Sequence, residues 1–434
     1  MKQRLIALVS FAFILSVAFG FYTTLEAKNE NAYSDRRKAI DKFLKVVDIV
    51  EKYYVDPIDI DTALQKAMDG MLSNLDAHSG YIEGKQYQEM NIKMQGEFGG
   101  LGITVSMRDG ALTVESPIEG TPADAAGIES GDIILKIDDK STIGMNIDDA
   151  VGLMRGKPGT KVTLTIIRKG RERPFEAPIV RAIIKVQSVY AKTYGDDVLY
   201  LRIVSFDKNV AASLKREINA RKGEFKGIIL DLRNNAGGLM DQAVEATDIF
   251  VDKGVIVSQK GRVESENRVI TASKNGTLTN IPMVVLVNGG SASASEIVAG
   301  SLQDHRRAVI VGEKTFGKGS VQVVMPLRDT GESDAIRLTI ARYYLPSGRS
   351  IQAMGIVPDV EVKRISFKEI ESEYEVKESQ LKGHLEAQLN AANGTTGEEK
   401  PKADPNVIAE TQLNNDYQLK TALGILRGLI VLKK

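Results

Sequence analysis

Residues Met283-Val-Val-Leu-Val-Asn-Gly-Gly-Ser-Ala-Ser-Ala-Ser-Glu296 describe a buried strand, a glycine break and the start of a helix. The uninterrupted apolar run that ends at Val287 is typical of a strand covered on both faces. Gly289-Gly290 then permits a sharp change of chain direction. A buried strand that leads directly into a helix indicates an α/β fold.

Three serines follow the glycine break, at the predicted helix N-terminus: Ser291, Ser293 and Ser295. Free backbone N–H groups and the positive end of the helix dipole meet there, and both favour an anion such as a tetrahedral oxyanion. A structural interpretation is also open, because Ser293-Ala-Ser-Glu296 fits a Ser-x-x-Glu capping box. The serines alone do not decide between catalysis and helix capping.

The surrounding sequence alternates between apolar strands and helices, which predicts a largely parallel sheet covered on both sides. We expect strands at Leu199–Val204, Gly227–Leu232, Met283–Val287 and Ala308–Val311, and helices at Val210–Ala220, Leu239–Phe250 and Ser295–Leu302.

A candidate base, Lys318, lies in Gly312-Glu-Lys-Thr-Phe-Gly-Lys-Gly319. This run nearly matches a phosphate loop, but Gly319 replaces the required Ser or Thr, and a strand pattern, Val321–Leu327, follows where a helix is needed. A nucleotide site is therefore excluded. A lysine among glycines can be desolvated and act as a base if its pKa falls from about 10.4 by about 3 units, on the order of 4 kcal/mol. Gln322 would lie on the same strand face and orient the amine; a solvated surface lysine is the alternative.

A third run, Asp231-Leu-Arg-Asn-Asn-Ala-Gly-Gly238, joins an apolar strand to a helix. Backbone amides at Gly237 or Gly238 could face a substrate carbonyl. Taken alone, the run is also an ordinary connection between a strand and a helix.

The composition excludes several kinds of chemistry. The chain has 434 residues, so we expect two or three domains, and its 57 basic and 57 acidic residues create no net field that would attract nucleic acid. It has no cysteine, which excludes a thiol nucleophile, disulfides and Cys-ligated zinc. His78, His305 and His384 form no metal-ligand pattern, so we expect neither a metal nor a cofactor.

The N-terminal residues predict a targeting segment. Lys2 and Arg4 precede an uncharged run, Leu5–Tyr22, whose length lies between those of a signal peptide and a membrane anchor. Leu25-Glu-Ala27 and Ala18-Phe-Gly20 are candidate cleavage sites, and a buried soluble helix is the remaining interpretation. With the basic end in the cytoplasm, we expect the rest of the chain in a bacterial periplasm, released or anchored to the inner membrane by residues 5–22.

The regions outside the core carry no catalytic signal. Apolar periodicity predicts helices at Arg37–Tyr54 and Ile60–Leu75. Two interpretations are open: these helices dock on a partner or form a dimer, or they make up a small helical lobe. From about Met94, glycine-rich turns and alternating runs predict a small β-rich module. Its strands are expected at Gly102–Met107, Ala111–Val114, Asp132–Ile137 and Lys161–Ile167, with a helix at Ile147–Met154.

The C-terminal part has the pattern of a charged helix from Pro358 to about Ala392 and then of a flexible linker over residues 393–405. Because this linker separates the last helix from the core, we expect the apolar face of that helix to dock on a subunit or partner. The face comprises Leu413, Tyr417, Leu423, Leu426 and Ile430.

Together, the three motifs resemble those of the carboxyl-terminal processing peptidases, or tail-specific proteases. Gly-Ser-Ala-Ser-Ala-Ser-Glu, Thr-Phe-Gly-Lys-Gly-Ser-Val-Gln and Asp-Leu-Arg-Asn-Asn-x-Gly-Gly occur in the family's order, and the resemblance covers roughly Lys38 to Val362. It implies a crotonase- and Clp-protease-like α/β core with an inserted PDZ domain and helical N- and C-terminal segments. The residue roles that it implies are nucleophile Ser293, base Lys318, base partner Gln322, oxyanion-hole amides in the Gly237/Gly238 turn and at Ala294, and a supporting carboxylate Asp304, with none for His305.

The β-rich module resembles a PDZ domain. Gly100-Leu-Gly-Ile103 is similar to the Gly-Leu-Gly-Phe loop whose amides bind a peptide's terminal carboxylate while the peptide adds as a strand. This resemblance implies that Gly100, Leu101, Gly102 and Ile103 bind a substrate C-terminus. Arg155, in Arg155-Gly-Lys-Pro-Gly159, matches an arginine that is linked in some relatives to switching between resting and active forms.

The sequence thus predicts an extracytoplasmic Ser/Lys endopeptidase that engages proteins with unfolded apolar C-termini, forms a homo-oligomer and has an activating adaptor. Two alternatives are an inactive PDZ scaffold on a degenerate core and an acyl-CoA enzyme of the crotonase kind. The expected divisions are a leader at 1–27, a helical region at 28–93, the PDZ domain at 94–182, the protease core at 183–365 and a helical C-terminal region at 366–434.

Overall fold

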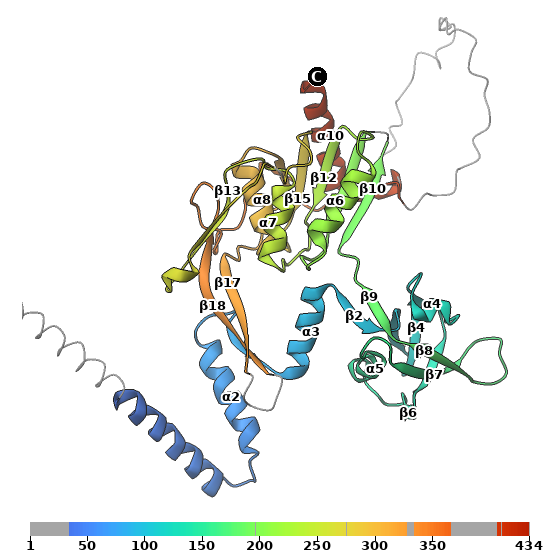
Figure 1. Ribbon diagram of the computed structural model, residues 1–434, viewed down its shortest axis with the longest axis vertical. Helices are drawn as coiled ribbons and strands as arrows, with labels where there is room; N and C mark the ends of the chain where they lie inside the picture. Colours follow the sequence, from blue (N-terminus) through green and yellow to red (C-terminus); the bar gives the residue numbers. More distant parts are fainter. Residues whose placement is uncertain are drawn as a thin grey trace, which may run out of the picture. The chain divides into compact units, whose positions relative to one another are not determined.

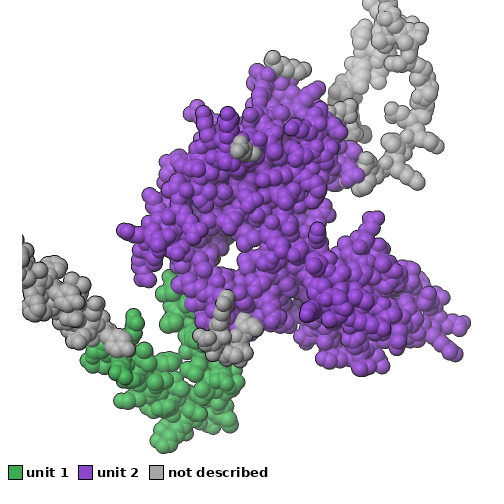
Figure 2. Space-filling view, viewed as in Figure 1, with its two compact units in different colours: residues 1–81 green, residues 82–434 purple. Residues whose placement is uncertain are grey.

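The computed structural model describes residues 34–195, 197–274, 276–327, 334–365, 406–408 and 410–433. The chain divides into two compact units, residues 1–81 and residues 82–434, which Figure 2 colours separately. The predicted leader, the charged segment after residue 365 and the linker at 393–405 lie outside the described residues. Within the described ranges, no helix has the length and apolar character needed to cross a membrane.

The smaller unit is helical, as its sequence period predicts. Residues 34–53 form a helix, and α2 (Ile60–Ser73) begins after Asp59, whose carboxylate accepts hydrogen bonds from the Asp61 N–H (3.2 Å) and the Thr62 hydroxyl (2.7 Å). The first helix leaves large apolar side chains exposed, among them Ile40, Phe43, Leu44, Val46, Ile49 and Val50. An apolar helix face of this kind is typical of an interaction surface. β1 (Gly80–Ile82) lies at the boundary between the units.

The larger unit contains the predicted α/β core (Figure 1). Its sheet has the order β10-β11-β12-β15-β16-β19; β10 runs antiparallel to β11, and the remaining neighbours are parallel. The strands are β10 (Val189–Tyr194), β11 (Val198–Ile203), β12 (Gly227–Asp231), β15 (Met283–Val287), β16 (Val309–Gly312) and β19 (Val360–Glu361).

Both faces of this sheet are covered, which explains why its strands are apolar without alternation. One face packs against α6 (Val210–Ala220), α7 (Met240–Asp248) and α8 (Ala294–Asp304). The opposite face packs against α10 (Tyr417–Leu432). The parallel connections leave the carboxyl ends of β12 and β15 side by side, so the two polar turns that follow these strands meet at one edge of the sheet.

The prediction that the last helix docks on a subunit or partner is wrong. α10 packs on β12, β15 and β16 of its own chain, with Leu419, Ala422 and Leu426 buried, because the sheet face beneath it would otherwise be uncovered. The segment is also interrupted: α9 (Glu410–Asn415) ends before Asp416, which caps α10 by accepting from the Leu419 N–H (3.0 Å).

A second sheet pairs β17 (Ser320–Pro326), β18 (Ala335–Tyr344), β13 (Val255–Gly261) and β14 (Arg268–Thr271) in antiparallel order. The short helix η1 (Glu264–Glu266) lies between β13 and β14. β17 confirms the strand predicted after the glycine-rich loop, and with it the exclusion of a phosphate loop.

The β-rich module is also confirmed. Its sheet has the order β3-β4-β5-β7-β8, with β6 paired to β5, around a separate apolar core. The elements are β3 (Ile103–Arg108), β4 (Ala111–Pro117), α4 (Pro122–Ala125), β5 (Ile133–Ile137), β6 (Lys140–Ser141), α5 (Ile147–Met154), β7 (Lys161–Ile167) and β8 (Phe175–Val180).

The module is joined to the rest of the unit by β2 (Glu97–Gly100) and β9 (Ala182–Lys185), which pair antiparallel. α3 (Gly84–Gln95) precedes β2, and the Lys208 N–H of the core donates to the Met94 carbonyl at 3.1 Å. Because the two units meet between Tyr81 and Ile82, α3 belongs to the larger unit. The sequence had instead placed this segment with the N-terminal helices, in the region 28–93.

Candidate active site

Ser293 is the N-cap of α8 and has a strained backbone. Its φ is +56° and its ψ is −112°, outside the left-handed helical well that non-glycine residues occasionally occupy. Such a conformation costs on the order of 1–3 kcal/mol and persists only where the surroundings enforce it. Here the neighbours are held from both sides: the Ala292 N–H donates to the Asn235 carbonyl (3.0 Å), and the Ile297 N–H donates to the Ser293 carbonyl (3.0 Å).

The structure separates the three candidate serines by the partners of their hydroxyls. The Ser291 hydroxyl donates to the Leu232 carbonyl (2.8 Å), and the Ser295 hydroxyl donates to the Asn235 carbonyl (2.8 Å). Both residues are fully buried, whereas Ser293 retains 8% exposure. Ser291 and Ser295 therefore hold the strand-end turns together, and Ser293 is the serine that a substrate can approach.

Glu296 connects the serine turn to the lysine loop. One carboxylate oxygen, Oε2, accepts from the Ser293 N–H (2.8 Å) and the Lys318 N–H (2.8 Å). The other, Oε1, accepts from the Gly317 N–H (2.7 Å) and the Thr315 hydroxyl (2.5 Å). Glu296 is fully buried. The capping box is thus present, but its glutamate also fixes the backbone of the candidate base next to that of the candidate nucleophile.

Lys318 lies in the loop before β17, two residues ahead of the first strand residue, Ser320, so it does not itself open the strand. It is half-buried, and the loop around it is closely packed. A Cβ on Gly319 would lie 2.5 Å from the Gln352 N–H nitrogen, and the Gly319 carbonyl accepts from the Tyr343 N–H at 2.8 Å. Gln322 uses its amide nitrogen to donate to the Ser320 hydroxyl (2.8 Å) and the Thr339 hydroxyl (3.1 Å).

The predicted oxyanion turn lies directly against Ser293. A Cβ built on Gly237, whose φ is +103°, would lie 2.9 Å from Ser293 Cβ and 3.0 Å from the Ala294 nitrogen. The Gly237 N–H donates to Asn235 Oδ1 (2.9 Å), so it is already occupied. Within the described residues, the Gly238 and Ala294 N–H groups have no hydrogen-bond partner. The sequence did not distinguish Gly237 from Gly238; of these two N–H groups, only that of Gly238 is without a partner among the described residues.

Tyr343 of β18 is a site residue that the sequence analysis missed. Its side chain is 5% exposed and lies close enough to Ser293 for the serine to lower the pKa of its hydroxyl. Burial raises the pKa of Tyr343 to about 12, against a smaller opposite effect of Ser293, so its hydroxyl stays protonated through the ordinary pH range. Only the pairing of β17 with β18 brings Tyr343 to the site, and β18 was not predicted.

The remaining candidates lie away from Ser293. Asp304 ends α8, ten residues after Ala294 begins it, which corresponds to roughly 15 Å along the helix. Its carboxylate pairs with Arg349 (2.8 Å) and accepts from the Ser347 N–H (2.9 Å), so it holds a surface turn. His305 Nε2 lies 2.7 Å from the Val255 carbonyl oxygen. The described residues contain no group of acidic or histidine side chains arranged to hold a metal ion.

The module presents a free strand edge and a glycine loop. β3 is at one end of its sheet, beside α5. The Gly102 carbonyl accepts from the Ile118 N–H (2.8 Å), whereas the Leu101 and Gly102 N–H groups have no partner in the part of the chain that the structure describes. Gly102 has a φ of +81°, and a Cβ there would lie 2.3 Å from the Thr121 side chain, so the loop tolerates no larger residue.

Arg155 lies where the module meets the strand that leads into it. Its guanidinium is 4.9 Å from the centre of the Phe98 ring, and the Gly156 N–H donates to the Gly99 carbonyl (3.1 Å). Arg155 Nε is buried without a hydrogen-bond partner among the described residues. The side chain therefore contacts β2.

Comparison with known proteins agrees with this geometry. Residues 197–362 match Peptidase family S41, and residues 113–168 match a PDZ domain. The carboxy-terminal-processing protease of Bartonella bacilliformis is 41% identical over 438 residues, which cover 99% of this chain and 97% of that protein. The chain belongs to peptidase family S41. This S41 peptidase is a carboxy-terminal processing serine protease with a PDZ domain.

Other relatives of the S41 peptidase carry the same description. The carboxy-terminal processing protease CtpA of Bacillus subtilis is 36% identical over 325 residues, covering 74% of this chain and 69% of that protein. Among solved structures, the photosystem II D1 C-terminal processing protease has a TM-score of 0.43 at 28% identity, covering 74% of this chain and 92% of that chain.

Proposed function

We propose that the S41 peptidase cleaves peptide bonds with a Ser293/Lys318 dyad and selects its substrates by their C-terminal tails. The observation that carries the dyad is the buried Glu296 carboxylate, whose Oε2 accepts from both the Ser293 and the Lys318 N–H groups. Two loops that are 25 positions apart in sequence are thereby held on one oxygen. The two other serines of this turn, Ser291 and Ser295, are fully buried.

In the acylation step, Ser293 Oγ attacks the scissile carbonyl carbon and its proton passes to neutral Lys318 Nζ. The carbonyl oxygen becomes an oxyanion that accepts from the Gly238 and Ala294 N–H groups at the positive end of α8. Collapse of this intermediate breaks the C–N bond, and the leaving amine takes the proton from Lys318. Gln322, whose nitrogen is held by Ser320 and Thr339, presents Oε1 as the atom that accepts from the lysine and orients it.

In the deacylation step, a water molecule gives a proton to Lys318 and attacks the acyl carbon. The same two amides donate to the second oxyanion, and Ser293 regains its proton as the new C-terminus leaves. Tyr343 lies beside Ser293 and, because its hydroxyl remains protonated, does not take the serine proton.

Substrate choice would depend on the PDZ domain. The partnerless Leu101 and Gly102 N–H groups provide donors for a terminal carboxylate, and the free edge of β3 accepts an extended chain as an added strand. Such a site selects a free, apolar and unfolded C-terminus. Arg155, which lies over Phe98 at the junction, is the residue through which tail binding would favour the competent arrangement.

The proposed cellular setting rests on the sequence. We expect a periplasmic protein that is released or anchored to the inner membrane by residues 5–22, and we expect no nucleic-acid partner. The exposed apolar face of the helix at residues 34–53 supports a homo-oligomer, and we expect an activating adaptor.

Cleavage of fluorescein-labelled casein by purified full-length variants tests the dyad. Ser293→Ala and Lys318→Ala should each abolish turnover, and the double variant should be no worse than either, because the two residues act as a unit. Lys318→Arg should also be inactive, since a guanidinium stays protonated. Substantial turnover by a folded alanine variant would refute the dyad, and an inactive wild type would favour a PDZ scaffold.

A further inference from the structure

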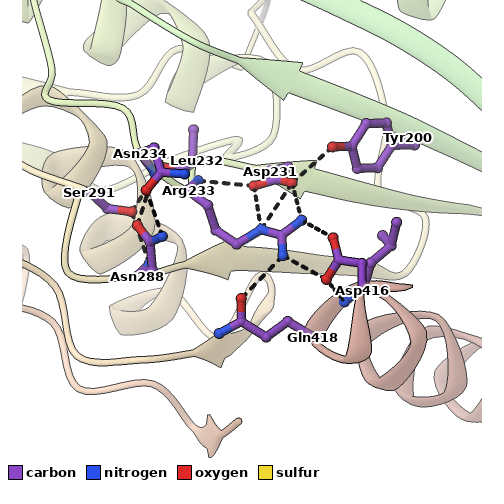
Figure 3. Close-up of polar contacts among 10 residues, drawn as sticks. Tyr200, Asp231, Leu232, Arg233, Asn234, Asn288, Ser291, Asp416 and Gln418 are labelled. Carbon is purple, nitrogen blue, oxygen red and sulfur yellow. Dashed lines mark hydrogen bonds and ion pairs between the residues drawn. The ribbon is translucent and has the colours of Figure 1, made fainter. Parts of the chain in front are cut away.

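The C-terminal helix makes a charged contact with the turn that carries the oxyanion amides. α10 lies beyond residue 362, where the match to the S41 family ends. Its N-cap residue, Asp416, and Gln418 of its first turn face Arg233, which occupies the third position of the Asp231–Gly238 turn (Figure 3). This contact joins two regions that are more than 180 residues apart in sequence.

The Arg233 guanidinium has a partner for every one of its nitrogens. Nε donates to Asp231 Oδ1 (3.0 Å), and one terminal nitrogen donates to Asp231 Oδ2 (2.6 Å) and Asp416 Oδ2 (2.8 Å). The other terminal nitrogen donates to Asp416 Oδ1 (2.8 Å) and Gln418 Oε1 (3.1 Å). Figure 3 shows the guanidinium between the two carboxylates. The planar fork is thus held in one orientation, which a single carboxylate would not achieve.

The contact is mostly buried, and its most exposed member is Asp416, whose side chain is 25% exposed. The Arg233 side chain is 14% exposed, and Asp231 is fully buried and also accepts from the Tyr200 hydroxyl (2.8 Å). Burial alone would raise the pKa of Asp416, but the hydrogen bonds from Arg233 outweigh it and hold that pKa below its ordinary value. Gln418 is 3% exposed, and its amide nitrogen donates to the Val362 carbonyl (2.7 Å).

The turn transmits this contact toward the catalytic groups through short bonds. Asn234, the next residue after Arg233, exchanges hydrogen bonds with the Asn288 side chain, at 2.9 Å in each direction. The Asn235 carbonyl accepts from the Ala292 N–H, and Asn235 Oδ1 holds the Gly237 N–H. These bonds connect Arg233 to the Ala292 backbone and to Gly237, so a displacement of Arg233 would be passed to the neighbouring Gly238 amide.

We propose that Asp416 and Gln418 are positioning residues for peptide-bond cleavage: by fixing Arg233, the C-terminal helix sets the position of the Gly238 oxyanion donor. The inference rests on the proposed function of Ser293 and the Gly238 amide. A purely structural role would differ, since α10 would then stabilise the sheet without changing the rate of the chemical step.

The test uses Asp416→Asn in the full-length protein. Asparagine still caps α10 but removes the charge that Arg233 binds. Leu423→Ala, on the buried face of α10 and away from Arg233, is the matched control that weakens helix packing alone. Each variant is reacted with a rhodamine fluorophosphonate over a range of probe concentrations, so that the maximal labelling rate at the serine is obtained separately from probe affinity. Thermal unfolding is recorded in parallel.

We expect Asp416→Asn to lower the maximal labelling rate and the casein kcat by about tenfold to hundredfold, as for a misplaced catalytic group, with probe affinity and KM within about twofold. Leu423→Ala should lower the melting temperature and leave both rates of the folded enzyme unchanged. Asp416→Glu, which keeps the charge, should recover part of the lost rate. If Asp416→Asn does not fold, Gln418→Ala is measured in the same way and should also lower the labelling rate.

Two results would overturn the inference. The first is an unchanged labelling rate and kcat in Asp416→Asn, or in Gln418→Ala where that variant is used instead. The second is a loss of labelling rate and kcat in Leu423→Ala as large as that in Asp416→Asn. The proposed function fails separately, because that failure would appear as labelling and casein cleavage that survive Ser293→Ala.

Discussion

Replacing Glu296 by glutamine should damage both stability and activity, because one carboxylate holds both catalytic loops. The carboxylate accepts two hydrogen bonds on each oxygen, from the N–H groups of Ser293, Gly317 and Lys318 and from the Thr315 hydroxyl. Glutamine has the same shape but keeps a single acceptor oxygen. Its NH2 group would face two donors in a site with no exposure to water.

The expected loss can be worked out from these contacts. Two charge-assisted hydrogen bonds disappear at about 1.5–3 kcal/mol each, so the free energy of unfolding should fall by about 3–6 kcal/mol. In urea, with an m-value of about 3 kcal/mol/M, the midpoint of the core transition should move down by about 1–2 M. Because the Ser293 and Lys318 backbones are displaced together, casein turnover by the folded fraction should fall about hundredfold.

Glu264→Gln is the control, since this glutamate is exposed on η1 and should change the free energy of unfolding by no more than about 0.5 kcal/mol. A Glu296→Gln variant that unfolds like the Glu264→Gln variant and keeps its turnover would refute the reasoning. The bridge would then be a consequence of the fold, with no part in holding the two loops.

Four further predictions concern strain, pH and the tail. Ser293→Gly and Ser293→Ala should both be inactive, but the glycine variant should be the more stable by up to about 2 kcal/mol. The reason is that relief of a backbone strain of about 1–3 kcal/mol exceeds the extra unfolded-state entropy of glycine. A glycine variant that is less stable than the alanine variant in thermal unfolding would contradict the strain. With a lysine base, kcat/KM should rise with pH and then stay level, without a step near the histidine value of about 6.5. Burial raises the pKa of Tyr343 from 10.0 to about 12, so this tyrosine stabilises the fold below pH 10 and loses that contribution as the pH rises toward 12. In a measurement of the free energy of unfolding against pH, Tyr343→Phe should remove this alkaline loss. Amidating the C-terminus of a folded-domain-plus-tail substrate should reduce cleavage much more than serine labelling by a small probe; equal cleavage of amidated and free-acid tails would mean that the PDZ domain does not recognise the carboxylate. Amidation is the sharper test, since a Gly102→Trp variant would disrupt packing against Thr121.

Much of the fold is readable from local sequence. The buried strands and the helices around Ser293 were predicted to within two residues at each end, because uninterrupted apolar runs and three-to-four-residue periods report burial directly. The helix at Ile147–Met154, bounded by Asn146 and Arg155, has the predicted ends. The docking of α10 was mispredicted, because an amphipathic face shows that a helix packs but not which surface it covers.

The site was predictable where chemistry is local and unpredictable where it depends on long-range contacts. Ser293, Lys318 and the Gly237/Gly238 turn stand in recognisable motifs. Tyr343 reaches Ser293 only because β18 pairs with β17, and Asp416 reaches Arg233 only because α10 covers the sheet. The double role of Glu296 was hidden for a related reason, since the capping-box pattern explains one of its four bonds and gives no signal of the three to the lysine loop.

The central claim is that Ser293 is the nucleophile and that Lys318 activates it. The most direct measurement labels the full-length protein with a fluorophosphonate, digests it and locates the adduct by fragment mass spectrometry within the peptide that contains Ser291, Ser293 and Ser295. The account predicts one adduct, on the Ser293 oxygen, and a labelling rate that collapses in Lys318→Ala while the fold is retained. An adduct on Ser291 or Ser295, or undiminished labelling in folded Lys318→Ala, would contradict it.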